Sequence, residues 1–187
     1  MKINHPLMHN NFLSSDMDSV RKLLKNKDLI LTQSKKVLEF ENKWSKWLGV
    51  KYSVFVNSGS SANFLSMLIL KSISSKKKEI IVPTLTWVSD INSVIMSGFK
   101  PVFVDINPQN LSMDEDQILK KINKNTLAVF ITHVQGFNGL SDRLLKTLKS
   151  RKILLVEDVC ESHGAKFKGK KLGTFGLISN FSFYYAH

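Results

Sequence analysis

The sequence has one cysteine, three arginines and no apolar run of membrane-spanning length. The single cysteine, Cys160, excludes an internal disulfide and a metal site built from cysteines alone. A membrane-spanning helix needs about 20 consecutive apolar residues, and the N-terminal stretch MKINHPLMHNN lacks the apolar centre of a signal peptide. We therefore expect a cytoplasmic protein with no membrane partner and no metal.

The net charge of +12 comes mostly from lysine, because the sequence has few arginines. A strongly basic chain is a candidate for nucleic-acid binding, because lysine and arginine release counterions from phosphates. Arginine is the usual residue for bidentate phosphate and base contacts. The lysines, moreover, are scattered, with runs only at 76–78 and 168–171. A solvated basic surface is the better explanation, and we expect no nucleic-acid partner.

Apolar runs alternate with helical patterns over most of the chain. Its 187 residues, 43% of them apolar, suffice for one domain with a core. Short connections between such elements are typical of a mostly parallel sheet with helices on both faces. The sequence therefore predicts a three-layer α/β fold. The expected strands are 80–83, 102–105, 127–131 and 153–156, and the expected helices are 84–98, 114–122 and 142–148.

Two helices and a strand are expected before this alternation. Ser14 and Asp16 are typical of a helix start, and a second helix is expected from its cap Ser34 to Gly49. The run Tyr52–Val56 is rich in β-branched and aromatic residues, which favours a strand.

The turn NSGSSAN follows that run and leads into an apolar helix. Backbone N–H groups and the dipole at a helix start favour a phosphate, and Gly59 allows close approach. Ser60 and Ser61 would add hydroxyl donors. A serine-rich helix start is also commonly no more than a cap.

Ionisable residues stand where two strands are expected to end. Asp158 follows the run 153–156, and His187 follows a second apolar run, Phe181–Tyr185. Ligands bind at strand ends in open α/β sheets, and a buried aspartate there needs a cationic partner such as a protonated pyridine nitrogen. Alternatively, Asp158 caps a turn and His187 is a chance chain end.

Three further features are open to more than one interpretation. Trp87 is either core or a cover for a flat aromatic ligand. His133 is a weak candidate for lining a sugar site, and His163 fits an ordinary turn histidine. The segment GKKLGTFG, residues 169–176, reads as a loop and follows neither the P-loop nor the dinucleotide-binding pattern.

Five segments together resemble the DegT/DnrJ/StrS family of pyridoxal-phosphate enzymes acting on nucleotide sugars. They are NSGSSAN, PTLTWVSDINSV, KPVFVDINPQNLSMD, EDVCESHGA and GTFGLISNFSFYYAH. The resemblance implies that residues 1–187 form the single large domain of a fold-type-I enzyme. It also implies that a C-terminal remainder with the small domain is absent, that the cofactor is pyridoxal or pyridoxamine 5'-phosphate, and that the whole protein is a homodimer. The unpaired sheet edge at the chain end likewise suggests a fragment.

The resemblance also assigns roles to individual positions. A turn and a hydroxyl hold the cofactor phosphate, an aromatic residue stacks on the ring, and a carboxylate pairs with the ring nitrogen. These are Gly59, Ser60, Ser61 and Ser182 for the phosphate, Trp87 for the ring and Asp158 for the nitrogen.

Two departures from the family pattern narrow the expected reaction. Aminotransferases of the family carry a lysine, covalently bound to the cofactor, where this sequence has His187. They commonly carry glutamine, near the ring hydroxyl, where it has Glu161. Both changes resemble the branch of 4-keto-6-deoxyhexose 3-dehydratases that serve bacterial surface polysaccharides. This implies a nucleotide-sugar substrate, with His187, Asp158 and Glu161 as catalytic residues. The alternatives are an aminotransferase of the same family and an inactive fragment.

Overall fold

The computed structural model describes residues 10–74 and 76–184. Contacts divide the chain into two compact units, one reaching to Phe55 and including Tyr184, the other formed by Val56–Phe183. His187 lies outside the described residues, so its expected role stays a prediction, as does the single domain over residues 1–187. Within the described ranges, no helix combines the length and hydropathy needed to cross a bilayer.

The first unit begins with helix α1, Ser14–Leu24. Its N-cap is Leu13 rather than a serine, because the Asp16 carboxylate accepts the Leu13 backbone N–H at 2.9 Å. An acid in the first turn therefore stabilises the start of this helix, where we expected a serine cap.

Helix α2, Lys35–Leu48, has the expected boundaries. The hydroxyl of Ser34 accepts the N–H of Lys36, and Gly49 ends the helix with a φ of 89°, which glycine adopts without strain. The predicted strand Tyr52–Val56 is wrong. The segment forms no ladder with any strand that the structure describes, and its N–H at Phe55 binds the Glu41 carboxylate at 2.7 Å.

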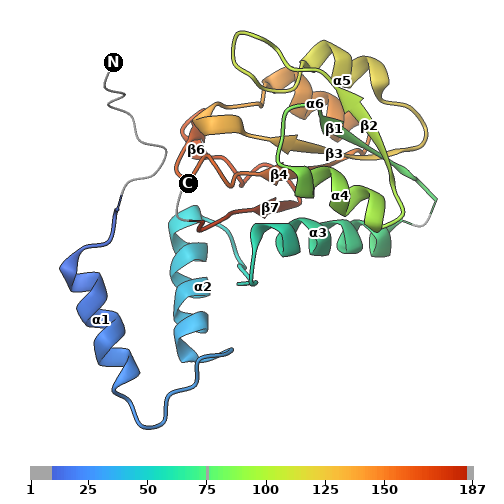
Figure 1. Ribbon diagram of the computed structural model, residues 1–187. Helices are drawn as coiled ribbons and strands as arrows, with labels where there is room; N and C mark the ends of the chain where they lie inside the picture. Colours follow the sequence, from blue (N-terminus) through green and yellow to red (C-terminus); the bar gives the residue numbers. More distant parts are fainter. Residues whose placement is uncertain (1–9, 75, 185–187) are drawn as a thin grey trace, which may run out of the picture. The chain divides into compact units, whose positions relative to one another are not determined.

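The second unit contains a parallel sheet in the order β2-β1-β3-β4-β7 (Figure 1). Helices α3 and α4 cover one face, and α5 and α6 cover the other. The predicted three-layer α/β fold is confirmed. The strands are β1 Glu79–Pro83, β2 Lys100–Val104, β3 Thr126–Thr132, β4 Leu154–Asp158 and β7 Ile178–Asn180, and the helices are α3 Gly59–Ile73, α4 Val88–Met96, α5 Glu115–Lys121 and α6 Asp142–Ser150.

Successive side chains of the central strand β3 enter opposite halves of the core. Phe130 packs in the cluster that contains Met67 of α3, whereas Ile131 packs in the cluster that contains Leu144 of α6. This is the period of two that an extended strand imposes. On β4 the same rule places the neighbouring side chains of Glu157 and Asp158 on opposite faces of the sheet. The two acids therefore have different surroundings.

The last strand lies earlier than predicted. We expected Phe181–Tyr185, but β7 is Ile178–Asn180, and residue 185 lies outside the described part of the chain. The pairing stops where β4 stops, because the Asp158 carboxylate accepts the N–H of Cys160 at 2.8 Å and turns the backbone away. The ladder between β4 and β7 therefore ends at Asn180.

Three short elements complete the unit. The one-turn 3₁₀ helix η1, Val134–Gly136, follows β3. Strands β5, Lys166–Phe167, and β6, Lys170–Lys171, form an antiparallel hairpin. The segment predicted as a loop over residues 169–176 thus begins with a short strand and continues irregularly to β7.

Candidate functional site

The start of α3 lies against the segments that leave β4 and β7. The Ser58 hydroxyl caps the helix by accepting the N–H of Ser61 at 3.1 Å. A Cβ added to Gly59 would stand 3.5 Å from Cys160 Sγ, 3.5 Å from Ser182 Cβ and 3.8 Å from Ser182 Oγ. The missing side chain therefore leaves a small space between a helix start and a hydroxyl. That is the arrangement which binds a phosphate.

The two serines predicted beside Gly59 differ in their surroundings. Ser61 is partly buried, and its hydroxyl lies 3.1 Å from the Ser58 hydroxyl. Ser60 is exposed to solvent in the first turn of α3. Both positions lie at the helix start, and their contacts with a phosphate stay a prediction.

Asp158 ends β4 on the face covered by α3 and is 4% exposed. Its Oδ1 accepts the N–H of Cys160 at 2.8 Å, and its Oδ2 lies 3.5 Å from the Asn63 amide nitrogen. No lysine or arginine of the described residues forms an ion pair with it. A buried carboxylate of this kind can accept a cationic partner from a ligand.

Behind Asp158 lies a second carboxyl group, Asp90 of α4, which is fully buried. The Asn63 amide nitrogen is 2.6 Å from Asp90 Oδ1, so one side chain touches both acids. Burial raises the pKa of Asp90 well above its ordinary value and the negative charge of Asp158 adds to this, while hydrogen bonds from Thr86 and Thr132 oppose it. Sequence reasoning missed Asp90, because an acid in the first turn of a helix is usually solvated.

The same amide connects α3 to the last strand. Asn180 of β7 donates its side-chain N–H to Asn63 Oδ1 at 2.8 Å, and Ser66 donates to Asn180 Oδ1 at 2.9 Å. All three side chains are buried. The network fixes the end of β7, from which the segment containing Ser182 leaves.

Besides Ser60, Trp87 and Glu161 are exposed members of the predicted site. Trp87 is the N-cap residue of α4 and is 69% exposed, so its indole ring is open to a flat ligand rather than part of the core. Glu161 follows β4, and its carboxylate accepts the N–H of Gln135 at 3.1 Å. Trp87 thus precedes α4 instead of lying within the predicted helix 84–98, and Glu161 lies in the segment after β4; their contacts with a cofactor stay a prediction.

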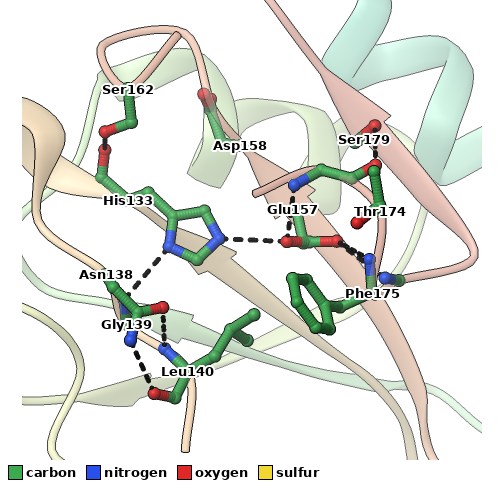
Figure 2. A network of polar contacts seen from close by, with 12 residues as sticks. His133, Asn138, Gly139, Leu140, Glu157, Asp158, Ser162, Thr174, Phe175 and Ser179 are labelled. Carbon is green, nitrogen blue, oxygen red and sulfur yellow. Dashed lines mark hydrogen bonds and ion pairs between the residues drawn. The ribbon is translucent and has the colours of Figure 1, made fainter. Parts of the chain in front are cut away.

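Glu157 points to the opposite face of β4 from Asp158, and Figure 2 shows the network around it. Its Oε2 accepts the N–H of Gly173 at 2.8 Å, and its Oε1 accepts those of Phe175 at 2.8 Å and Gly176 at 2.7 Å. This fully buried carboxylate thus holds the loop that leads into β7. Burial alone would raise the pKa of Glu157, but its hydrogen bonds, led by that with His133, hold it below the ordinary value.

His133 belongs to this network and lines no open site. It is 0% exposed, its Nδ1 accepts the N–H of Gly139 at 3.1 Å, and its Nε2 lies 3.2 Å from Glu157 Oε2 (Figure 2). Since Nδ1 is an acceptor, the proton lies on Nε2 and is donated to Glu157. The suggestion that His133 lines a sugar site is therefore wrong. His163 instead packs its ring against Phe181, with centroids 5.5 Å apart.

A parallel sheet whose carboxyl edge combines a helix start, a buried carboxylate and an exposed tryptophan defines an α/β protein suited to a phosphorylated aromatic ligand. The chain belongs to the DegT/DnrJ/EryC1/StrS aminotransferase family, whose profile matches residues 12–187.

The chain is similar to particular members of this family. The chain is 33% identical over 189 residues to GDP-4-keto-6-deoxy-D-mannose 3-dehydratase of Escherichia coli O55:H7, covering 99% of this chain and 48% of the relative. It is 36% identical over 148 residues to GDP-perosamine synthase of Escherichia coli O157:H7, covering 79% and 40% respectively. The solved structure of the E. coli 3-dehydratase with bound hydrated PLP matches with a TM-score of 0.93 and 32% identity, covering 100% of this chain and 49% of that chain. The chain thus spans about half the length of the relatives it matches.

Proposed function

We propose that the chain is part of a pyridoxal- or pyridoxamine-phosphate enzyme that removes the 3-hydroxyl group of a 4-keto-6-deoxyhexose nucleotide. The product would serve surface polysaccharide (O-antigen) synthesis, and a cytoplasmic location stays a prediction. The observation that carries the proposal is Asp158, a buried carboxylate with no cationic partner among the described residues. A protonated pyridine nitrogen supplies that cation.

The other residues at this edge of the sheet fit the same cofactor. The start of α3 and the nearby Ser182 hydroxyl would hold the phosphate, and Gly59, which has no side chain, would allow close approach. The exposed indole of Trp87 would cover one face of the ring. When bound, the cofactor supplies an electron sink, which the Asp158 carboxylate maintains by keeping the ring nitrogen protonated.

His187 distinguishes dehydration from transamination in this proposal. Imidazole has no primary amine, so it cannot hold the cofactor covalently, but it can accept and return a proton near neutral pH. We assign to it the removal of a proton at the cofactor's C4′ carbon and protonation of the departing C3 oxygen. The similarity to a 3-dehydratase over 99% of the chain supports this role, and Glu161 would lie near the ring hydroxyl.

The reaction is tested with pyridoxamine phosphate and a 4-keto-6-deoxyhexose nucleotide. With pyridoxamine phosphate we expect a released sugar that is lighter by one oxygen atom, measured by mass spectrometry, because the 3-hydroxyl group leaves as water while the cofactor's amine is consumed and released as ammonia. With pyridoxal phosphate we expect no borohydride-trapped bond between cofactor and protein. Replacing His187 with lysine should lower dehydration about 100-fold or more, the range for removing a general base, and allow a trapped lysine adduct. Dehydration at the wild-type rate in His187→Lys would remove the base assignment, and a trapped adduct in the wild type would favour the aminotransferase.

We further propose that the protein acts as a homodimer. One side of α3 presents the apolar side chains of Leu65, Leu68, Ile69 and Ile73, which are 39–52% exposed. A contiguous apolar stripe of this kind on a helix is typical of a surface that another protein covers.

The expected result of Ile69→Lys is a change from dimer to monomer in sedimentation velocity, because the ammonium group would be desolvated in the interface. Lys71→Gln, on the other side of the same helix, is the control and should leave the dimer intact. A wild-type protein that sediments as a monomer would contradict the homodimer.

A further inference from the structure

Three oxygen atoms beneath the predicted ring-nitrogen site form a closed triangle, those of Asp90 and Thr132 buried and that of Thr86 partly buried. Asp90 Oδ2 lies 2.5 Å from Thr86 Oγ1 and 2.8 Å from Thr132 Oγ1, and the two threonine oxygens are 2.8 Å apart. All three separations are hydrogen-bond distances between oxygens. Each side of the triangle therefore requires one hydrogen.

The two threonine hydroxyl groups supply two hydrogens for these three contacts. If Asp90 were ionised, both hydroxyls would donate to it, and the contact between Thr86 and Thr132 would have no hydrogen. A proton on Asp90 Oδ2 supplies the third, so that each oxygen donates once and accepts once around the triangle. A proton on Asp90 thus accounts for all three contacts.

The surroundings of Asp90 agree with this count. Asp90 is 0% exposed, and the titratable groups that act on it are Asp158 on β4 and Cys160 after β4. Burial raises the pKa of Cys160, so it remains a neutral thiol. On α3, in the segment between β1 and α4, and on β3, the groups that contact Asp90 are the uncharged Asn63, Thr86 and Thr132 respectively. No cation among the described residues balances a second negative charge beside Asp158.

We propose that Asp90 is a proton-carrying positioning residue, which holds the Asn63 carboxamide against Asp158 and leaves Asp158 as the only anion facing the cofactor's ring nitrogen. The protonated triangle fixes Asp90 Oδ2, so that Oδ1 accepts the Asn63 amide at 2.6 Å. That amide in turn lies 3.5 Å from Asp158 Oδ2. The part of the proposal that concerns the cofactor rests on the proposed function.

The first test needs no cofactor and compares the wild-type protein with Asp90→Asn. An aspartate whose pKa is raised by folding gives stability that is complete below its ordinary pKa and is lost as pH rises toward the folded value. Between those values the folding equilibrium constant of the wild type should fall relative to that of Asp90→Asn by up to about tenfold per pH unit. Urea titrations from about pH 4, the ordinary aspartate value, to pH 8 measure this ratio. A ratio independent of pH would overturn the proton on Asp90.

The second test measures pyridoxamine phosphate binding by the same variants. Asparagine is neutral and can still donate to the threonines and accept from Asn63, so affinity should stay within about threefold of wild type, whereas Asp90→Leu should weaken it at least about tenfold. An Asp90→Asn protein that loses affinity as strongly as Asp158→Asn would show that Asp90 acts as an anion, against the proposal. If the wild type binds no cofactor, the proposed function fails together with the positioning role, while the urea titrations still decide whether Asp90 carries a proton.

Discussion

Replacing Asp158 with asparagine should lower turnover of the nucleotide-sugar substrate about a thousandfold. Loss of one partner from a buried ion pair costs about 3–5 kcal/mol, and each 1.36 kcal/mol on a barrier is about tenfold in rate. Asp158 is 4% exposed, so water cannot replace the missing charge at the ring nitrogen. The measurement is kcat/KM for dehydration with saturating pyridoxamine phosphate.

The fold should survive this substitution. Asparagine keeps an oxygen to accept the N–H of Cys160, and the substitution removes a buried charge that has no cation beside it among the described residues. Urea titration should therefore show an Asp158→Asn protein at least as stable as the wild type. The loss of turnover in Asp158→Asn would then be caused by the missing negative charge and not by unfolding of the protein.

Asp105→Asn is a matched control, because this exposed aspartate follows β2 at the carboxyl edge of the same sheet. Its carboxylate binds the Ile106 N–H at 2.8 Å and takes no part in the Asp90–Asp158 cluster. We expect unchanged turnover in this variant. Normal turnover in Asp158→Asn would remove the carboxylate from the mechanism and with it the main support for a pyridine ring at this position.

The strands predicted correctly are those whose partners follow from the alternating pattern. β3 is buried along its whole length, so a continuous apolar run identified it. The run Tyr52–Val56 has equal strand propensity, but a strand also needs a partner with free backbone groups, and propensity does not encode the partner. The displaced end of β7 has the same origin, since the turn at Asp158 decides where its pairing stops.

The residues of the candidate site that stand at a strand end or a helix start were predictable from the sequence. A residue whose role depends on burial was not. Asp158 was predictable because it ends a strand of a parallel sheet, at the edge where ligands bind, and Gly59 because a serine-rich helix start favours an anion. Asp90 was missed, since its burial depends on packing between α3 and α4 that no local pattern reveals. Glu157 and Asp158 are adjacent in the sequence, but the period of two in a strand places their side chains in separate environments.

Glu157 lies on the other face of β4, and every group that hydrogen-bonds to its carboxylate among the described residues is a donor. The backbone N–H groups of Gly173, Phe175 and Gly176 and the Nε2–H of His133 all point at its two oxygens. A carboxylate is an acceptor at both oxygens, so it satisfies all four. An amide of identical shape cannot, because its NH₂ group would face donors in either orientation.

Glu157→Gln should therefore lower the free energy of unfolding by about 2–6 kcal/mol, because two buried donors lose their acceptor and each costs about 1–3 kcal/mol when it is left unsatisfied. Urea titration at pH 7 measures this, and Glu161→Gln is the control. Glu161 is exposed and accepts one backbone N–H, so its replacement should change stability by less than about 0.5 kcal/mol. Equal unfolding curves for Glu157→Gln and the wild type would contradict an ionised Glu157.

The pH dependence of the same pair of proteins tests the charge directly. The hydrogen bonds to Glu157 hold its pKa below the ordinary value, so the stability that they give is present above about pH 4.3 and is lost as pH falls through the folded value. The difference between wild type and Glu157→Gln should consequently be complete at neutral pH and shrink in acid. Because the loop held by Glu157 leads through β7 to Ser182, the glutamine variant should also bind pyridoxamine phosphate more weakly at neutral pH. Weaker binding of this kind would show that a carboxylate on one face of β4 influences phosphate binding on the other.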